Sequence, residues 1–261
     1  MQLAQHFDDE HIPNDDEEED NITDPFKFFR VGEENMGTRD LAKSELLSAL
    51  PGQHYSMNGK SLCLEFSSNS GPISINLQVD ASPGCGGIVW PAGQILSNYL
   101  IKQGSDFMQG KRVVELGSGT GLVGLIAAKL GAGRVWITDQ ASLLDIMQQN
   151  LSLNRLQCNC EVAELNWGTS IPTAMSSPDV ILAADCVYFE PAFPLLVRTL
   201  DSLATDKTQV FFCYKKRVRK ADKRFFGMLK KKFTWHEVMD DPNRNLYNRE
   251  SITLIKLLKV V

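Results

Sequence analysis

The sequence predicts an α/β protein built on a doubly wound, mainly parallel sheet of seven strands, with a β-hairpin before it. Between about residues 112 and 214, short apolar segments alternate with helix-patterned segments, which is typical of β-α-β units. The last two expected strands have no clear helical pattern between them, which favours an antiparallel pair at one edge of the sheet. A glycine-rich turn after the first strand of this region indicates where a ligand would bind.

Charge divides the chain of 261 residues into an acidic leader and a larger folded part. Residues 1–24 hold ten of the 32 acidic residues and none of the 27 bases, so the rest of the chain carries a net charge of +5. The run Asp15–Asp20 has no apolar periodicity, and we expect the leader to be disordered. We divide the remainder into an N-terminal segment with the hairpin, residues 25–83, and a main domain, residues 84–261.

Several protein classes are disfavoured by simple patterns. The N-terminus lacks the basic-then-apolar pattern of a secretory signal, and no apolar run approaches the roughly 20 residues of a membrane span. The six cysteines are scattered, and Cys158 and Cys160 form only a C-x-C pair. The four histidines make no ligand cluster, so we expect no metal site, and the cysteine usage suits a reducing compartment, the cytoplasm.

The N-terminal elements follow from apolar periodicity. Alternating apolar residues over 62–66 and 73–79, joined by the polar residues 67–72, predict the hairpin. Residues 25–50 carry phenylalanines and leucines and are interpreted as a short helix or a segment lying over the body. Pro91 suits the first turn of a helix whose apolar face includes Leu96.

The main domain continues the alternation. We expect strands over 112–116, 134–138, 161–165, 179–184, 209–214, 234–238 and 252–259, and helices over 122–130, 141–156, 191–203 and about 215–232. The last of these helices holds ten bases and one acid, Asp222, beside an apolar stripe that includes Phe225 and Leu229. Residues 240–248 are predicted to be a loop.

Residues 115–121 carry the most specific pattern in the chain. Gly117, Gly119 and Gly121 alternate, with Glu115 two residues before the first of them, giving E-x-G-x-G-x-G. A carboxylate at Glu115 would repel a pyrophosphate but suits the cationic end of S-adenosylmethionine. The pattern therefore favours this cofactor, with Glu115 as the deciding residue.

Asp139 ends the second parallel strand. An acid there can accept hydrogen bonds from both hydroxyls of a ribose. Dinucleotide-binding proteins share this feature, and Gly119, Gly121 and Gly124 also match their G-x-G-x-x-G spacing. A β-α-β turn without a ligand is the other alternative at this point.

Asp185 and Tyr188 follow the strand predicted over 179–184. Open α/β sheets bind ligands at the carboxyl ends of their strands, so both residues are candidates for chemistry. They could instead be structural, with Asp185 capping the next turn and Tyr188 packing. Cys186 lies between them, but no histidine stands nearby in sequence to activate its thiol.

Taken together, the motifs resemble one known family. They are VELGSGTGLVG at 114–124, Val89-Trp90 before it, Asn166-Trp167-Gly168 after it, Ala184–Tyr188, and Tyr214–Arg217. Over about residues 60–260 the sequence is similar to the seven-β-strand protein lysine methyltransferases called methyltransferase family 16, which have a Rossmann-like class I methyltransferase fold. Within that family it most resembles the fungal elongation factor 1-alpha lysine methyltransferases.

The resemblance implies a set of cofactor contacts. Gly117, Ser118 and Gly119 would line the methionine end and ribose of S-adenosylmethionine. Asp139 would bind the ribose hydroxyls, and Trp167 would contact the adenine.

The resemblance also implies where the substrate lies. Trp90, which by itself reads as ordinary core, would close the site, and Ala184 would present backbone to the cofactor. Asp185 and Tyr188 would lie beside the target lysine of a protein, with elongation factor 1-alpha the expected substrate. We expect a cytoplasmic monomer that binds no membrane.

Two other functions deserve comparison. The basic residues of 215–232 could serve an RNA methyltransferase. However, the sequence reads Asp-Cys-Val-Tyr at 185–188, where an N-P-P-[FYW] element would hold the amine of a base. A binding protein that keeps the fold without catalysis is the second alternative, and the intact glycine loop with Glu115 and Asp139 argues against it.

Overall fold

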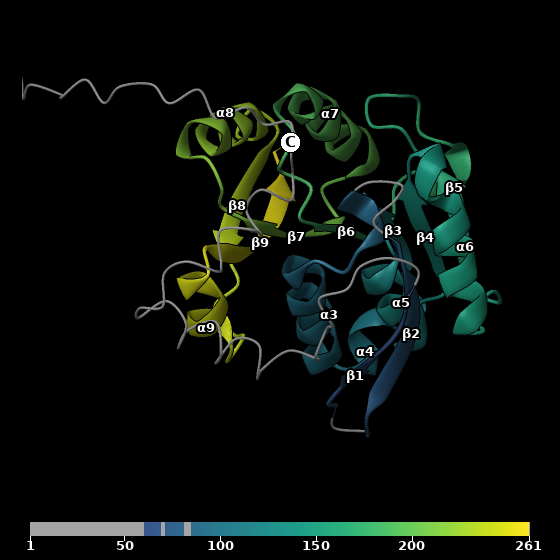
Figure 1. Ribbon diagram of the computed structural model, residues 1–261. Helices are drawn as coiled ribbons and strands as arrows, with labels where there is room; N and C mark the ends of the chain where they lie inside the picture. The colour runs from purple at the N-terminus through teal and green to yellow at the C-terminus, as the bar shows by residue number, and fades with distance from the viewer. Residues whose placement is uncertain (1–59, 69–70, 81–84, 261) are drawn as a thin grey trace, which may run out of the picture.

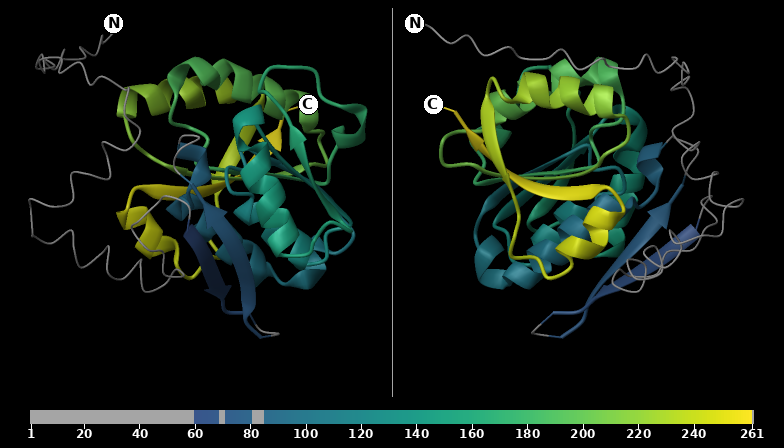
Figure 2. Two further views of the ribbon diagram at one scale, coloured as in Figure 1. Left: turned by 45° about the vertical axis from the view of Figure 1, so that its right-hand side comes forward. Right: turned by 90° about the vertical axis from the view of Figure 1, so that its left-hand side faces the viewer.

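The computed structural model describes residues 60–68, 71–80 and 85–260 (Figures 1 and 2). The predicted acidic leader and the segment 25–50 lie outside the described residues. Within the described part, a central sheet lies between two layers of helices, and a separate hairpin packs beside one layer.

The central sheet has seven strands and confirms the predicted class. They are β3 (Arg112–Leu116), β4 (Arg134–Asp139), β5 (Cys160–Glu164), β6 (Val180–Ala184), β7 (Gln209–Lys215), β8 (Phe233–Glu237) and β9 (Ile252–Lys259). Their order is β5-β4-β3-β6-β7-β9-β8. The first five in this order are parallel, and β9 pairs antiparallel with both β7 and β8.

The strand order reverses between β3 and β6. From β3 the chain proceeds outward to β4 and β5, then returns to place β6 on the other side of β3. Such a reversal leaves a crevice at the carboxyl ends of the two strands, because their following connections leave in opposite directions. The glycine loop after β3 and Asp185 after β6 therefore share this point of the fold.

Helices cover both faces of the sheet. They are α3 (Pro91–Gln103), α4 (Ser105–Met108), α5 (Leu122–Lys129), α6 (Leu144–Leu153), α7 (Phe193–Leu203), α8 (Arg219–Leu229) and α9 (Arg244–Arg249), with 3-10 turns at Cys85–Gly87, Ala141–Leu143, Thr173–Met175 and Glu190–Ala192. Figure 1 shows α7 and α8 on one side of the sheet and α3 and α5 on the other. Apolar residues from the two faces of the strands form two separate core clusters, one under each helix layer.

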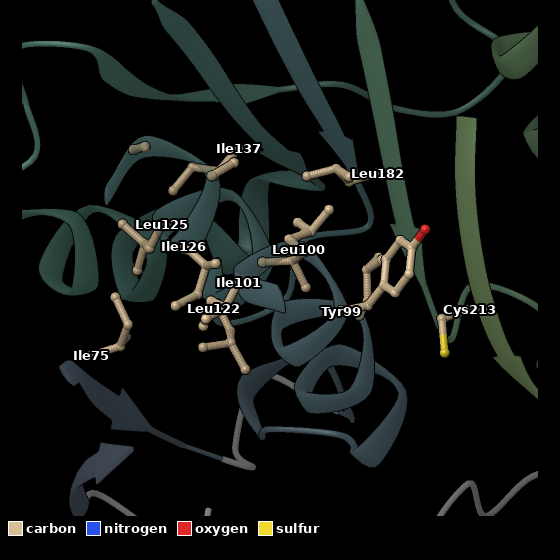
Figure 3. Packing of buried hydrophobic residues seen from close by; sticks show 14 of the residues in the cluster. Ile75, Tyr99, Leu100, Ile101, Leu122, Leu125, Ile126, Ile137, Leu182 and Cys213 are labelled. Atoms are coloured by element: carbon tan, nitrogen blue, oxygen red, sulfur yellow. The ribbon is translucent and has the colours of Figure 1, made fainter. Parts of the chain in front are cut away.

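The larger cluster lies under α3 and α5. Figure 3 shows Leu100 of α3, Leu125 of α5, Ile137 of β4 and Leu182 of β6 meeting there, together with Ile75 of the hairpin. All five side chains are buried, so the hairpin shares the core of the main domain. Burial of each such side chain stabilises the fold by about 1.5–3 kcal/mol.

The hairpin forms as predicted, from β1 (Lys60–Phe66) and β2 (Ile73–Val79). Asn150 of α6 and Asn154, which caps its C-terminal end, satisfy the outer edge of β2. The Asn154 side-chain amide accepts the Asn76 N–H at 3.0 Å and donates to the Asn76 carbonyl at 2.7 Å, and the Asn150 amide does the same with Gln78 at 2.6 and 3.1 Å. Positions i and i+4 of a helix and i and i+2 of a strand have similar spacings, so the side-chain amides substitute for a neighbouring strand.

Three predicted boundaries are wrong. The helix expected over 141–156 is a 3-10 turn followed by α6, and the helix expected over 215–232 is limited to α8, since Lys215 still pairs in β7 and Val218 is extended. The loop expected over 240–248 contains the start of α9. The short α9 has no clear periodicity, and burial of Tyr247 in the core gives it the stability that local sequence does not.

Candidate active site

The glycine loop between β3 and α5 requires glycine for two reasons. Gly117, Gly119 and Gly121 have φ angles of 59°, 57° and 82°, in the left-handed region. A Cβ on Gly119 would also lie 2.5 Å from the carbonyl oxygen of Gly86, and one on Gly117 would lie 2.9 Å from the ring of Trp167. The Gly86 carbonyl and the Trp167 ring therefore lie close to the backbone of the loop.

Asp139 holds the glycine loop from the end of β4. Its Oδ2 accepts the Gly119 N–H at 2.8 Å, and its Oδ1 accepts the Gln140 N–H at 2.7 Å. Burial raises the pKa of Asp139, while these two hydrogen bonds act in the opposite direction. Each carboxylate oxygen has a second lone pair, so Asp139 keeps capacity to accept two hydroxyl groups.

Glu115 lies inside the junction of β3 and α5. Its side chain is buried, and its Oε2 accepts the Gly124 N–H at 2.9 Å. This bond satisfies one of the unpaired N–H groups in the first turn of α5. Burial raises the pKa of Glu115 to about 8. These contacts join strand to helix, and a role of Glu115 toward the cationic end of a cofactor stays a prediction.

Ser118 extends the pairing of β3 with β4 into the loop. Its N–H donates to the Thr138 carbonyl at 3.0 Å, and its Oγ accepts the Thr138 N–H at 2.8 Å. The side chain is buried and bonded within the loop. Ser118 therefore fixes the shape of the turn that Gly117 and Gly119 open.

Trp167 lies between the end of β5 and the glycine loop. Its half-buried ring lies against Gly117, close to the buried Cys186 that follows β6. The Cys186 thiol donates to the Leu116 carbonyl at 3.3 Å, and burial holds its pKa well above the ordinary value. Cys186 is therefore a neutral packing residue and is unsuited to act as a nucleophile.

Asp185 occupies a strained position after β6. Its φ of 58° is in the left-handed region, where a residue other than glycine is uncommon. Its backbone N–H donates to the Cys213 carbonyl of β7 at 2.7 Å, and its side chain is only 5% exposed. Ala184, the last residue of β6, is partly buried and pairs with the same Cys213.

Arg217 is the residue of this site that sequence reasoning missed. Its Nη1 and Nη2 donate to Oδ1 and Oδ2 of Asp185 at 2.8 and 2.7 Å. Its guanidinium carbon also lies 6.0 Å from the centre of the Trp90 ring, at the start of α3. Arg217 ends the motif Tyr214–Arg217, to which the resemblance assigned no role, and its place just beyond β7, the neighbour of β6, is a second signal that could have distinguished it.

Tyr188 and Phe189 extend this end of the sheet to the surface. The two side chains are 44% and 50% exposed, although they are large and aromatic. Neighbouring exposed aromatic residues beside a buried charged pair are suited to contact another molecule. The structure thus brings Trp90, Asp185 and the Tyr188 segment to the carboxyl ends of the parallel strands, where the glycine loop also lies.

Comparison with known proteins identifies the class of this site. A family model described as lysine methyltransferase matches residues 69–232. The chain belongs to the lysine methyltransferase family. The resemblance to methyltransferase family 16 is therefore confirmed, and the enzyme is a protein-lysine N-methyltransferase that uses S-adenosylmethionine.

Individual relatives of this methyltransferase agree with the family match. The chain is 37% identical over 202 residues to protein-lysine N-methyltransferase EFM6 of Saccharomyces cerevisiae, covering 67% of this chain and 82% of the relative. It is 36% identical over 155 residues to EEF1A lysine methyltransferase 3 of Xenopus tropicalis, covering 59% of this chain and 68% of the relative.

Solved structures agree with the fold of the methyltransferase. The chain superposes on the 16S rRNA methyltransferase RsmC of T. thermophilus with a TM-score of 0.53 and 17% identity. The match covers 78% of this chain and 51% of that structure, which contains AdoMet and guanosine. At this identity the likeness supports the class I methyltransferase fold alone.

The residues present fit S-adenosylmethionine. Asp139 can accept the two hydroxyls of a ribose, and the missing side chains at Gly117 and Gly119 let Trp167 and the Gly86 carbonyl lie close to the loop. Trp167 provides an aromatic surface next to Gly117. Among the described residues, no group of His, Cys, Asp and Glu is arranged to hold a metal ion, and no helix is long and apolar enough to cross a membrane.

Proposed function

We propose that this methyltransferase acts on a lysine of elongation factor 1-alpha, with Asp185 and Tyr188 receiving the lysine side chain. The observation that supports this substrate is the similarity to a relative named for that activity, EEF1A lysine methyltransferase 3. The placement of Asp185 and the exposed Tyr188 at the carboxyl end of β6 supports the lysine site.

The proposed cofactor contacts follow the loop from β3 to β5. Gly117 and Gly119 allow close backbone approach, Asp139 binds the ribose hydroxyls, and Trp167 contacts the adenine. Ser118 supports this loop from β4.

The remaining proposed contacts surround the reacting end. Trp90 closes the site at the start of α3, and Ala184 presents backbone where β6 ends. Glu115 acts on the cationic end of the cofactor from beneath the loop, where its carboxylate also accepts the Gly124 N–H of α5.

The chemistry requires the lysine as a neutral amine. The cofactor supplies an electrophilic methyl group on a sulfonium, so a C–N bond forms from the amine lone pair as the C–S bond breaks and sulfur keeps that electron pair. Lysine has an ordinary pKa near 10.4, so it must first release a proton to solvent. Asp185 orients the amine by accepting an N–H, and Tyr188 provides an aromatic wall. Such positioning can supply several kcal/mol of the acceleration.

The test uses S-adenosylmethionine labelled in its methyl group. The purified enzyme is incubated with recombinant elongation factor 1-alpha and, separately, with a whole-cell extract with and without nuclease. Label on a lysine of the recombinant factor, located by mass spectrometry, is the expected result. Label on a different protein would overturn the proposed substrate, and label lost with nuclease would indicate an RNA substrate.

A further inference from the structure

We propose that Arg217 is a positioning residue for methyl transfer: it fixes the Asp185 carboxylate and cancels its charge, so that Asp185 receives the substrate lysine as a neutral amine. The inference rests on the proposed role of Asp185. It assigns a function to an ion pair that bridges the ends of two neighbouring parallel strands, β6 and β7.

The contacts of Asp185 leave one direction open for a substrate. Its two oxygens together offer about four lone-pair sites. Oδ1 accepts from Arg217 Nη1 at 2.8 Å and from the Lys215 N–H at 3.2 Å, and Oδ2 accepts from Arg217 Nη2 at 2.7 Å. Among the described residues no other donor bonds Oδ2, so its second lone pair can accept one N–H of an incoming amine. Two parallel bonds to a planar guanidinium hold this oxygen in a fixed direction.

Arg217 is itself held in place by several contacts. The Arg217 guanidinium lies 6.0 Å from the Trp90 ring, and its Nη1 also donates to the Lys215 carbonyl at 3.3 Å. Asp222 of α8 lies close enough to Arg217 for the two charges to interact. The side chains of Arg217 and Asp185 are 15% and 5% exposed, so water screens the pair only weakly.

The charge of Arg217 bears directly on the proton of the lysine. An isolated buried carboxylate would attract the ammonium form and raise the pKa of the lysine, which opposes methylation. The adjacent guanidinium removes that attraction while leaving the oxygen able to accept a hydrogen bond. The nearby thiols Cys186 and Cys213 add no charge, since burial holds the pKa of each well above its ordinary value.

Other charged groups around the pair are few among the described residues. Lys215 and Lys216 lie at the end of β7, and Asp222 faces Arg217 from α8. Tyr188 follows Asp185 by three residues along the chain, and its side chain is exposed. Without Arg217, both Asp185 and Asp222 would favour the ammonium form, so the lysine would release its proton only at higher pH.

The experiment measures single-turnover methylation against pH, at saturating cofactor, for wild type, Arg217→Gln and Arg217→Lys. We expect Arg217→Gln to move the midpoint of the rising limb upward by about one pH unit or more, the usual effect of losing an adjacent opposite charge. Its rate should therefore fall about tenfold or more near neutral pH and recover partly in alkaline buffer. Arg217→Lys keeps the charge but not the paired bonds, so its rate should fall while its midpoint stays near that of wild type.

Arg219→Gln is the matched control, because it removes the same charge at an exposed position two residues away. Arg219→Gln should leave the dependence of the methylation rate on pH unchanged. An unshifted midpoint in folded Arg217→Gln, with the rate lowered equally at all pH values, would show a merely structural role and overturn the inference.

The double variant Asp185→Asn/Arg217→Gln keeps the inference testable if Arg217→Gln does not fold, because it removes both charges of the buried pair. Against Asp185→Asn alone, the added Arg217→Gln should move the midpoint upward by less than Arg217→Gln does when Asp185 is present, and an additional shift of similar size would overturn the inference.

The substrate is elongation factor 1-alpha or, if wild type leaves that protein unlabelled, the protein that it labels in extract. In that second case the proposed substrate fails while Arg217 is still tested. Wild type that labels neither would overturn both proposals.

Discussion

The backbone N–H of Gly119 donates to Oδ2 of Asp139 at 2.8 Å and joins the glycine loop after β3 to the end of β4. The two residues lie 20 positions apart, Gly119 in the loop that follows β3 and Asp139 at the end of the neighbouring parallel strand β4. The bond aligns the carboxylate with the open side of the loop, so the group proposed to bind ribose also sets the shape of the loop that faces it. Loss of Asp139 therefore removes both the proposed acceptor of the ribose hydroxyls and the hydrogen bond that shapes the glycine loop.

Asp139→Ala should weaken binding of S-adenosylmethionine by about 10-fold or more, because a hydrogen bond to a charged group contributes roughly 1.5–3 kcal/mol. Isothermal titration calorimetry on the folded variant measures the effect. Asp145→Ala, at an exposed position in the first turn of α6, is the control and should bind as wild type does. Equal affinity in the two variants would remove Asp139 from the cofactor site.

Glu115→Gln should change how stability depends on pH. Burial raises the pKa of Glu115 from 4.5 to about 8, so between these values the folded protein binds more protons than the unfolded chain. Wild-type stability therefore falls as pH rises through this window, while a glutamine has no proton to lose. The advantage of Glu115→Gln in unfolding free energy should grow from about pH 5 to about pH 8, measured by urea denaturation.

The matched control is Glu65→Gln, at an exposed position of the hairpin. Its difference from wild type should stay constant over the same range. A constant difference for Glu115→Gln as well would show that Glu115 is ionised throughout.

Gly119→Ala should destabilise the protein more than Gly110→Ala does. Both glycines have positive φ, 57° and 71°, so each alanine incurs the left-handed cost of about 1–2 kcal/mol. Only at Gly119 would the new Cβ meet a neighbour, the Gly86 carbonyl at 2.5 Å, while nothing lies within 4 Å at Gly110. Overpacking adds about 1–3 kcal/mol, which chemical denaturation can measure. Equal losses of unfolding free energy in the two variants would show that residues 85–87 can move away from the new Cβ without destabilising the fold.

Asn150→Ala should lower the unfolding free energy by roughly 2–4 kcal/mol, because each buried group left unpaired costs about 1–3 kcal/mol and water recovers part of it. The fully buried side chain bonds the N–H and carbonyl of Gln78 in the hairpin and also donates to the Thr120 carbonyl in the glycine loop at 3.0 Å. Asn154→Ala, which loses the more exposed bonds to Asn76 and a bond to the Asn150 carbonyl, should cost less. The reverse order would contradict a link between hairpin and loop.

Asp185→Asn should lose most activity, on the order of 100-fold, while cofactor affinity stays close to wild type. The amide has one acceptor oxygen instead of two and presents an NH₂ group to the Arg217 guanidinium, so the fixed direction toward the amine is lost. Single-turnover methylation at saturating cofactor is the measurement. Asp206→Asn, at an exposed turn before β7, is the control. Wild-type rates from folded Asp185→Asn would place the lysine site elsewhere.

Tyr188→Phe separates two roles for the phenol. A mild loss in the same assay is expected if the half-exposed ring acts mainly as a wall, and a severe loss if the hydroxyl orients the amine. The ring is retained in either case, so burial and packing change little.

The sequence by itself determined the class of the fold, and it predicted a site at the glycine loop. Runs such as 112–116 and 180–184 are short, mostly apolar and bounded by turns, and the alternation with helices admits few topologies. The glycines at 117, 119 and 121 indicate a loop with positive φ angles, because few other residues tolerate that backbone conformation. Local preference and tertiary structure agree at these positions, so the local signal was sufficient.

The tertiary structure decided which charged groups meet. Asp185 and Arg217 are 32 residues apart, and only the pairing of β6 with β7 brings them into contact. The same holds for Glu115, whose place in the pattern favoured a cofactor contact, whereas the packing of α5 on β3 directs its carboxylate to Gly124. Secondary structure depends on neighbours along the chain, but the partner of a buried charge depends on strand order and on which face of the sheet the side chain occupies. Neither is contained in local sequence, because both follow from how distant elements pack.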